Sequence, residues 1–253
     1  PEATWLLDHA ELHVVPMVNP DGRIKAEGGA YWRKNTDNDD GCTSSSYGVD
    51  LNRNSSYEWN SGGSSSYACD ETYHGPYPAS EPEVMAIENY MRSIFPDQRG
   101  PGDNDPAPQD TTGVMITLHS YSQLVLYPWG NTSTPAPNAA GLRTLGLKFG
   151  YFNRYNINQS ISLYPTSGTT DEWAYGTLGI AGYTFELGTA FFQSCSYFEN
   201  NILRSNLDAL WYAFKSARRP YQTPSGPDVT ALTISPATVY QGDTASISGA
   251  ADD

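Results

Sequence analysis

Short apolar segments that alternate with amphipathic stretches place the strongest constraint on the fold of this chain. Residues 114–118, 123–127 and 180–187 are apolar runs with the pattern typical of buried strands. Residues 142–152 and 202–214 carry apolar side chains at helical spacing, and the second stretch is followed by basic residues, as helix ends commonly are. Strands that alternate with helices predict an α/β fold, with a mixed parallel and antiparallel central sheet and helices on both faces.

Two other segments carry sequence signals for the start of a helix and for a turn. Ser80-Glu81-Pro82-Glu83 has the capping-box pattern of a helix start, and apolar residues follow at helical spacing until Pro96. Residues 11–18 are mostly apolar and end at Asn19-Pro20-Asp21-Gly22, which predicts a strand followed by a tight turn. Most of the chain between this turn and the predicted helix, residues 23–79, has the composition of loops.

The composition changes after Arg219. Residues 220–228 are rich in Pro and polar residues and are predicted to form a linker. Residues 229–253 alternate polar and apolar side chains between turn signals, a pattern typical of the first strands of a β-sandwich. We therefore expect a main domain at residues 1–219 and the start of a truncated β-sandwich-like appendage at residues 229–253.

The net charge limits which partners are expected. The chain has 28 acidic and 14 basic side chains, and its formal net charge of −14 argues against nucleic acid or an anionic membrane as a partner. No run reaches the roughly 18 consecutive apolar residues of a membrane helix. Gly, Ser, Thr, Asn and Tyr are abundant while charged residues make up 17%, a composition that favours an exported protein.

Cysteines and one acidic loop offer lesser signals. Cys42 and Cys69 bracket a segment too polar to pack by itself, and a disulfide between them would stabilise it by roughly 3 kcal/mol. Cys195 is interpreted as a small buried hydrophobe. Asp37-Asn38-Asp39-Asp40-Gly41 could bind Ca²⁺ through clustered oxygen atoms, but a solvated acidic loop is the favoured interpretation.

Four polar side chains are candidates for a site. His119 and Glu186 stand at the ends of predicted strands, where α/β sheets bind their ligands. Arg33 and Arg53 lie in loops rich in Asn, Gly and Tyr. Taken singly, each has an ordinary interpretation: a semi-buried histidine, a surface carboxylate, or arginines in salt bridges.

Taken together, six motifs in order along the chain favour a functional interpretation. They are Asn19-Pro20-Asp21-Gly22, Trp32-Arg33-Lys34, Gly48-Val49-Asp50-Leu51-Asn52-Arg53-Asn54, Glu71-Thr72-Tyr73-His74-Gly75, His119-Ser120-Tyr121-Ser122-Gln123 and Thr184-Phe185-Glu186-Leu187. This ordered set resembles the carboxypeptidase A/B family of zinc metallocarboxypeptidases, from about Trp5 to Phe214. In character the chain is closest to the secreted bacterial carboxypeptidase T-like enzymes. The resemblance implies the zinc carboxypeptidase fold, with residues 1–219 as the C-terminal portion of the catalytic domain.

The resemblance also implies catalytic roles. His119 is similar to a zinc ligand of the family, and neutral imidazole is a donor suited to Zn²⁺. Glu186 resembles the general base that takes a proton from zinc-bound water and delivers it to the leaving amine. Arg33 resembles the cation that stabilises the oxyanion of the tetrahedral intermediate. The expected reaction is hydrolysis of the C-terminal peptide bond, with release of single residues.

Substrate-binding roles follow in the same way. Asn52 and Arg53 are similar to the pair that grips the terminal carboxylate of the substrate. Tyr164 resembles the tyrosine that closes over the bound residue, and Tyr121 belongs to a motif that implies contact with substrate. Asp171 aligns with the floor of the specificity pocket. An acidic residue there implies release of basic residues, and neighbouring threonines leave room for apolar ones as well.

The chain departs from the family's pattern in its zinc site. The family holds one zinc with two His and one Glu, and two of these ligands come from a His-x-x-Glu motif that this sequence lacks. His9 and His13 have unsuitable spacing and position to replace them. We therefore expect a fold that is incomplete at the N-terminus, a chain that is inactive alone, and a missing N-terminal segment as one partner beside peptide C-termini.

A second hypothesis comes from a different class of protein. A zinc-free module could bind peptide C-termini through Asn52 and Arg53 without cutting them. The resemblance favours the enzyme, and it also implies that Cys42 and Cys69 form a disulfide, as in some secreted members of the family. A disulfide agrees with a secreted, extracellular protein.

Overall fold

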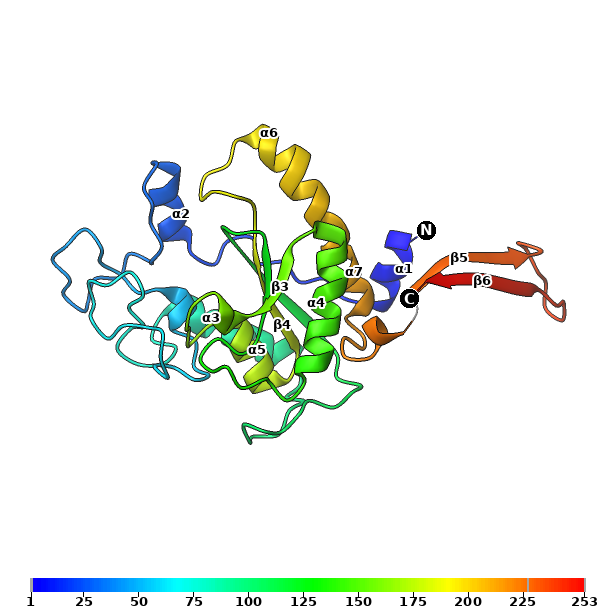
Figure 1. The fold of residues 1–253 in the computed structure, drawn as a ribbon, viewed down its shortest axis with the longest axis horizontal. Helices are drawn as coiled ribbons and strands as arrows, with labels where there is room; N and C mark the ends of the chain where they lie inside the picture. The colour runs from blue at the N-terminus through cyan, green and yellow to red at the C-terminus, as the bar shows by residue number, and fades with distance from the viewer. Residues whose placement is uncertain (1, 227, 253) are drawn as a thin grey trace.

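The computed structural model describes residues 2–226 and 228–252 (Figure 1). The helices are α1 (Glu2–His9), α2 (Pro20–Glu27), α3 (Pro82–Ile94), α4 (Ala139–Asn153), α5 (Thr170–Leu178), α6 (Cys195–Tyr197) and α7 (Arg204–Ser216), with short 3₁₀ turns at Leu51–Arg53, Ser160–Ser162 and Thr223–Ser225 and a π-helical segment at Phe198–Leu203. The strands are β1 (Val114–His119), β2 (Leu124–Tyr127), β3 (Asn156–Gln159), β4 (Ala181–Glu186), β5 (Asp228–Ser235) and β6 (Ser246–Asp252).

The main sheet has four strands in the order β1-β4-β2-β3. β1 pairs with β4 in parallel, β4 with β2 antiparallel, and β2 with β3 in parallel. This arrangement confirms the predicted mixed sheet. It also sets β1 against β4 so that His119 and Glu186 are register partners at the carboxyl ends of both strands.

Helices cover both faces of this sheet. Along β4, Tyr183 and Phe185 point to the face where α4 and α7 pack, because successive side chains of a strand alternate between faces. Gly182 lies on the opposite face, where a Cβ atom would stand 2.3 Å from the backbone oxygen of Asp171 in α5. Glycine at this position therefore lets α5 approach the sheet closely.

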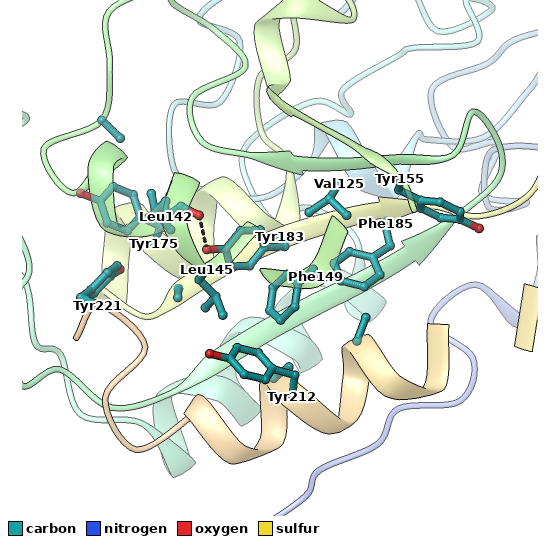
Figure 2. Packing of buried hydrophobic residues seen from close by; sticks show 14 of the residues in the cluster. Val125, Leu142, Leu145, Phe149, Tyr155, Tyr175, Tyr183, Phe185, Tyr212 and Tyr221 are labelled. Atoms are coloured by element: carbon teal, nitrogen blue, oxygen red, sulfur yellow. Dashed lines mark hydrogen bonds between the residues drawn. The ribbon is translucent and has the colours of Figure 1, made fainter. Parts of the chain in front are cut away.

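Aromatic side chains fill the core between the sheet and α4. Figure 2 shows Phe149 of α4 against Tyr183 and Phe185, with ring centroids 5.1 and 5.3 Å apart. All three side chains are fully buried. The hydroxyl of Tyr183 donates to the backbone oxygen of Leu142 at 2.7 Å, which satisfies the one polar atom that this ring brings into the core.

Most predicted elements form, with shifted ends. Strands predicted at 114–118, 123–127 and 180–187 correspond to β1, β2 and β4, and the helix predicted after Ser80 is α3. The start of α3 differs from a capping box. Glu81 occupies the N-cap position without a side-chain hydrogen bond to the helix, because its carboxylate instead accepts from Asn35 at 2.5 Å and from Ser80 at 2.7 Å.

The prediction of a strand at residues 11–18 and a turn after it is wrong. These residues form no strand, and apolar side chains such as Leu12 and Val14 are more than half exposed. Pro20 instead begins helix α2, with the side chain of Asn19 accepting from Gly22 at 2.9 Å. A strand is stable only with a pairing partner, and none of the described residues pairs with 11–18.

Two features lie near the C-terminal end. Residues 220–226, predicted as part of a linker, pack against the main body: Tyr221 is buried beside α4, and its hydroxyl donates to Gly179 at 2.8 Å. Beyond them, β5 and β6 form an antiparallel hairpin that projects from the body in Figure 1. Of the rest of the predicted linker, Asp228 begins β5, and residue 227 lies outside the described residues, as does residue 253. The domain boundaries stay a prediction.

Cys195 is exposed, contrary to its interpretation as a buried residue. It begins α6 directly after Ser194, whose hydroxyl caps the helix by accepting from Tyr197 at 3.2 Å. Ser194 and Ser196 on either side of it are exposed as well, so this short helix begins at the surface.

The core predicts a stability test. Phe149→Ala should lower the free energy of unfolding by about 3–5 kcal/mol, because it removes a fully buried ring and leaves a cavity against Tyr183 and Phe185. Leu147→Ala, on the exposed side of the same helix, should cost under about 1 kcal/mol. Urea unfolding followed by circular dichroism measures both, and equal losses would contradict the described packing.

Candidate active site

A cavity of about 280 Å³ opens at the carboxyl ends of β1 and β4. Charged residues from three separate regions of the chain line it together with aromatic and hydroxyl side chains. The lining residues are Arg33, Asn52, Arg53, His119, Ser120, Tyr121, Ser122, Leu126, Ser160, Leu163, Tyr164, Thr166, Thr169, Asp171, Thr184, Glu186 and Phe191. The structure therefore brings together the eight side chains predicted for catalysis, zinc binding and substrate binding.

His119 stands at the end of β1 on the cavity wall. The protein around its imidazole lowers the pKa of His119 to about 4, first because burial disfavours the charged ring and then because Arg33 lies nearby. At neutral pH the ring is therefore uncharged. One of its nitrogen atoms then has a lone pair that can accept a hydrogen bond or bind a metal ion.

Glu186, at the end of β4, is buried with 8% of its surface exposed. Burial raises the pKa of Glu186 to about 7, the charge of Arg33 opposes this shift, and the carboxyl of Asp171 adds to it. A carboxyl group with a pKa near neutrality can both accept and release a proton, which is the property required of a general acid–base catalyst.

Arg33 is held by a carboxylate beneath it. Its Nε donates to Oδ2 of Asp50 at 2.6 Å, and Asp50 is almost fully buried. Burial lowers the pKa of Arg33, but Asp50, Tyr164 and Glu186 outweigh that effect and leave the pKa above its ordinary value. The guanidinium thus keeps its charge at the edge of the cavity.

Asn52 and Arg53 lie on the 3₁₀ turn that follows Asp50. The backbone N–H of Asn52 donates to Oδ1 of Asp50 at 3.1 Å, and Oδ1 of Asn52 accepts from the backbone of Thr170 at 3.1 Å. Nε and Nη1 of Arg53 donate to the backbone oxygens of Gly63 and Asn52. These bonds fix both side chains. Among the described residues they leave Nδ2 of Asn52 and Nη2 of Arg53 as donors for a ligand.

Aromatic rings form the mouth of the cavity. Tyr164 and Tyr121 are roughly half exposed there, and Tyr121 meets the ring of Phe191 edge-on at 4.8 Å. Phe191 was missed in the sequence, as were Leu126, Ser160 and Leu163. The available signal for Phe191 was a pair of adjacent phenylalanines in the polar segment just after the strand that ends at Glu186. Nothing in the local sequence distinguished the other three residues as part of a site.

Asp171 and Glu172 open helix α5 at the floor of the cavity. Both are buried, and Asp171 lines the cavity whereas Glu172 is absent from its wall. Asp171 thus lies in the cavity wall, and its place at the floor of a specificity pocket stays a prediction.

The predicted disulfide between Cys42 and Cys69 is confirmed, with Cα atoms 5.2 Å apart. Inside the segment that it closes, Nζ of buried Lys34 donates to three backbone oxygens, those of Ser46, Ala68 and Asp70, at 2.6–2.8 Å. The disulfide and this lysine hold a polar segment that has little apolar packing of its own.

The described residues do not complete a zinc site. Zinc in proteins takes three or four protein ligands, and no group of three His, Cys, Asp or Glu side chains in residues 2–226 and 228–252 could hold a metal ion. His119 is the one imidazole among the residues that line the cavity. Nδ1 of His9 lies 2.7 Å from the backbone oxygen of Trp5, and Nδ1 of His13 lies 2.7 Å from the hydroxyl of Tyr90. No such group lies in the acidic loop at residues 37–41 either.

Comparison with known proteins identifies the family. Residues 1–207 match the family model described as zinc carboxypeptidase. The chain belongs to the zinc carboxypeptidase family. Human mast cell carboxypeptidase A is 36% identical over 193 residues, which are 73% of this zinc carboxypeptidase chain and 42% of the relative. Mouse carboxypeptidase A1 is 33% identical over 200 residues, 74% of this chain and 42% of the relative.

Solved structures agree with this assignment. The zinc carboxypeptidase chain is similar to the crystal structure of thrombin activatable fibrinolysis inhibitor, with a TM-score of 0.73 and 27% identity over 86% of this chain and 54% of that one. Bovine thrombin-activatable fibrinolysis inhibitor in complex with tick carboxypeptidase inhibitor gives a TM-score of 0.67 at 27% identity, over 85% and 70% of the two chains. The likeness to bacterial carboxypeptidase T stays a prediction. No described helix is long and apolar enough to cross a membrane.

The disulfide predicts how the stability of the chain depends on redox conditions. Cys42→Ser together with Cys69→Ser should lower the free energy of unfolding by about 3 kcal/mol, since a closed loop of this length restricts the unfolded chain. Cys195→Ser, at an exposed position, should change it by less than about 0.5 kcal/mol. Thermal unfolding with and without reductant measures both, and an unchanged melting temperature for the double variant would contradict the prediction.

Proposed function

We propose that this zinc carboxypeptidase chain forms the substrate-binding and proton-transfer part of an enzyme that releases single residues from peptide C-termini. One observation carries the proposal: the cavity sets two arginines and an asparagine amide around a carboxyl group whose pKa lies near 7. A cationic clamp beside a proton acceptor is suited to binding a terminal carboxylate and hydrolysing the adjacent peptide bond.

The clamp explains why the enzyme would act at chain ends. A guanidinium and an amide can each donate hydrogen bonds to a carboxylate, and Arg53 and Asn52 are fixed by backbone contacts before any ligand binds. A peptide bond in the middle of a chain offers no carboxylate to these donors. The donors would then stay unpaired in a partly buried cavity, which costs free energy.

Proton transfer and charge stabilisation fall to two other residues. The carboxylate of Glu186 takes a proton from the attacking water, and the resulting acid passes it to the leaving amine. Arg33 donates to the oxyanion that forms at the scissile carbonyl, and its ion pair with Asp50 keeps the guanidinium in place. Tyr164 at the cavity mouth would close over the bound residue.

Zinc would polarise the scissile carbonyl and activate water, but these residues do not hold it alone. The activity therefore requires further ligands from outside the 253 residues, and His119 would be this chain's contribution. In keeping with that need, the chain covers 42% of the length of human mast cell carboxypeptidase A. We expect one zinc per complete enzyme, and no calcium.

The pocket floor supports a mixed residue preference. Asp171 offers a carboxyl group to a basic side chain, while Thr166, Thr169 and Thr184 add methyl groups that suit apolar side chains. The disulfide favours an oxidising, extracellular compartment, where peptide and protein C-termini would be the substrates.

One observation favours a second candidate function. Because His119 is the single imidazole in the cavity lining and no described group could hold a metal, the same clamp could bind peptide C-termini without cutting them. A binding module and an enzyme share the clamp and differ in the need for Glu186.

Glu186→Gln tests the enzyme. We expect it to abolish turnover of a peptide with a free C-terminus and to leave peptide affinity within about threefold, because an amide keeps the shape but cannot accept the proton. Glu199→Gln, at an exposed position, is the matched control and should keep full activity. Hydrolysis, peptide binding by calorimetry and zinc content should be measured on the same preparations of the complete protein.

The outcomes separate the alternatives. Zinc lost together with turnover would make Glu186 a ligand, and retained turnover would remove it from the mechanism. A wild-type protein that binds free C-termini, contains no zinc and cuts nothing would be a binding module.

Asp171→Ala tests the residue preference. The ratio of kcat/KM for peptides ending in Lys or Arg to that for peptides ending in Leu or Phe should fall at least tenfold, about 1.4 kcal/mol. Asp110→Ala, an exposed aspartate, should leave the ratio unchanged. If Asp171→Ala changes the ratio by less than about threefold, Asp171 does not determine specificity.

A further inference from the structure

The first turn of helix α5 is capped by a residue from a distant part of the chain. Thr169 occupies the N-cap position, but its side chain does not cap the helix, and its hydroxyl donates to Oε2 of Glu172 at 3.0 Å. The first backbone N–H of the helix, that of Thr170, donates to Oδ1 of Asn52 at 3.1 Å. Asn52 lies 118 residues earlier, on the turn that carries the proposed carboxylate clamp. One side chain therefore serves both the helix and the clamp.

The direction of this bond determines which end of the Asn52 amide is left for a ligand. An Asn side chain has an acceptor end, Oδ1, and a donor end, Nδ2, and half a turn of the amide exchanges them. A backbone N–H can only donate, so the amide atom that faces Thr170 must be the oxygen. The hydroxyl of Thr170 contacts the same oxygen at 3.4 Å. Asn52 lines the cavity, and among the described residues no group accepts a hydrogen bond from its Nδ2.

The clamp turn and the start of α5 are also docked by other contacts. The backbone N–H of Ser55 donates to the backbone oxygen of Gly168 at 3.0 Å. Gly168 has a φ of +65°, and a Cβ atom there would stand 2.4 Å from the backbone oxygen of Arg53, so glycine permits this close approach. The bond from the helix to Asn52 is therefore not what holds the two segments together, and what it adds is the orientation of the amide.

We propose that Thr170 is a positioning residue that orients the amide of Asn52 so that Nδ2 donates to the terminal carboxylate of a bound peptide. This inference rests on the proposed carboxypeptidase function. Thr170 does not line the cavity and acts only through Asn52. An amide held in this orientation loses little rotational freedom when the peptide binds. It also cannot turn its oxygen toward the carboxylate, where the two acceptors would repel each other.

The same bond joins two parts of the cavity that bind one residue of the substrate. Thr170 is the neighbour of Asp171, which lines the cavity where the terminal side chain is proposed to bind. The bond to Asn52 thus fixes a donor for the carboxylate relative to the start of the helix that carries Asp171. A C-terminal residue has its carboxylate and its side chain on the same Cα atom, so their two binding partners must stand at one fixed separation.

Thr170→Pro removes the backbone donor. Proline suits the first position of a helix, and Thr169 already has the extended conformation, with φ −87° and ψ 153°, that a residue before proline adopts. The fold should therefore be retained, while the ring takes the place of the N–H and Oδ1 of Asn52 loses its partner. The Kd of a short peptide ending in Leu with a free carboxylate should rise about tenfold, because a hydrogen bond to a charged group is lost or weakened.

The same peptide ending in a carboxamide is the matched ligand. Its Kd should change by less than about threefold, because a carboxamide can pair with either end of the Asn52 amide. Calorimetry on the complete protein in the Glu186→Gln background, which is expected to leave peptides uncut, measures both constants. Equal losses for the two ligands would mean general damage to the site and would overturn the proposal, as would an unchanged Kd for the free carboxylate.

Two further variants separate the hydroxyl of Thr170 from its backbone N–H. Thr170→Val removes the hydroxyl, Thr170→Ser keeps it, and both keep the N–H. Each should leave the Kd of the free-carboxylate peptide within about threefold, since the backbone donor makes the shorter of the two bonds. A tenfold loss in Thr170→Val would contradict the role of the backbone donor.

Hydrogen exchange of the complete protein, followed by NMR, tests the bond without any peptide. The first N–H groups of a helix have no partner inside the helix. The N–H of Thr170 should nevertheless be protected, and it should exchange at least tenfold faster in Asn52→Ala. Asn104→Ala, at an exposed asparagine, is the control and should leave this exchange unchanged. Equal exchange in the wild type and in Asn52→Ala would show that Asn52 does not cap α5 and would overturn the proposal.

The two measurements distinguish failure of this inference from failure of the proposed function. A wild-type protein that binds neither ligand would overturn the proposed function and, with it, the role of the amide in holding a carboxylate, whatever the exchange of Thr170 shows. A wild-type protein that prefers the free carboxylate, and keeps that preference in Thr170→Pro, would leave the proposed function standing and overturn the positioning role of Thr170.

Discussion

The parallel pairing of β1 with β4 is the contact on which the candidate active site depends. It aligns six residues of each strand and ends with His119 opposite Glu186. Because side chains alternate along a strand, the register that buries Tyr183 and Phe185 under α4 also turns Thr184 and Glu186 to the cavity. A slip of one residue would exchange the core face for the cavity face, so the packing energy of the aromatic core fixes the position of the Glu186 carboxyl group.

A polar scaffold positions the other half of the site. The turn that carries Asn52 and Arg53 has few apolar side chains, and its position depends on hydrogen bonds instead. Asp50 bonds both Arg33 and the backbone of Asn52, and the buried amide of Asn54 donates to the backbone oxygen of His74 at 2.8 Å. Such a network is most stable when all its members are paired. The disulfide and buried Lys34 hold the segment beside it in place.

The sequence allowed prediction of the parts of this structure that local patterns determine. The helix after Ser80 and the strands that flank His119 formed because spacing, burial and stop signals agreed there. Residues 11–18 had an equally apolar pattern and formed no strand, since pairing depends on a neighbour distant in sequence. Glu172 was missed for a related reason: only the fold reveals that Gly130, 42 residues away, donates to its carboxyl group. The cavity residues were predicted from a resemblance of ordered motifs rather than from periodicity, and their catalytic roles remain proposals.

The acidic side chains of the site differ in whether a cation is paired with them. Asp50 has Arg33 as a direct partner and acts as a fixed anion that orients a cation. Glu186, Asp171 and Glu172 have no such ion pair among the described residues, and burial raises the pKa of each. With a pKa of about 7, Glu186 can change protonation state at modest cost near neutral pH. Burial without a paired cation is therefore the physical condition on which the proton transfer proposed for Glu186 depends.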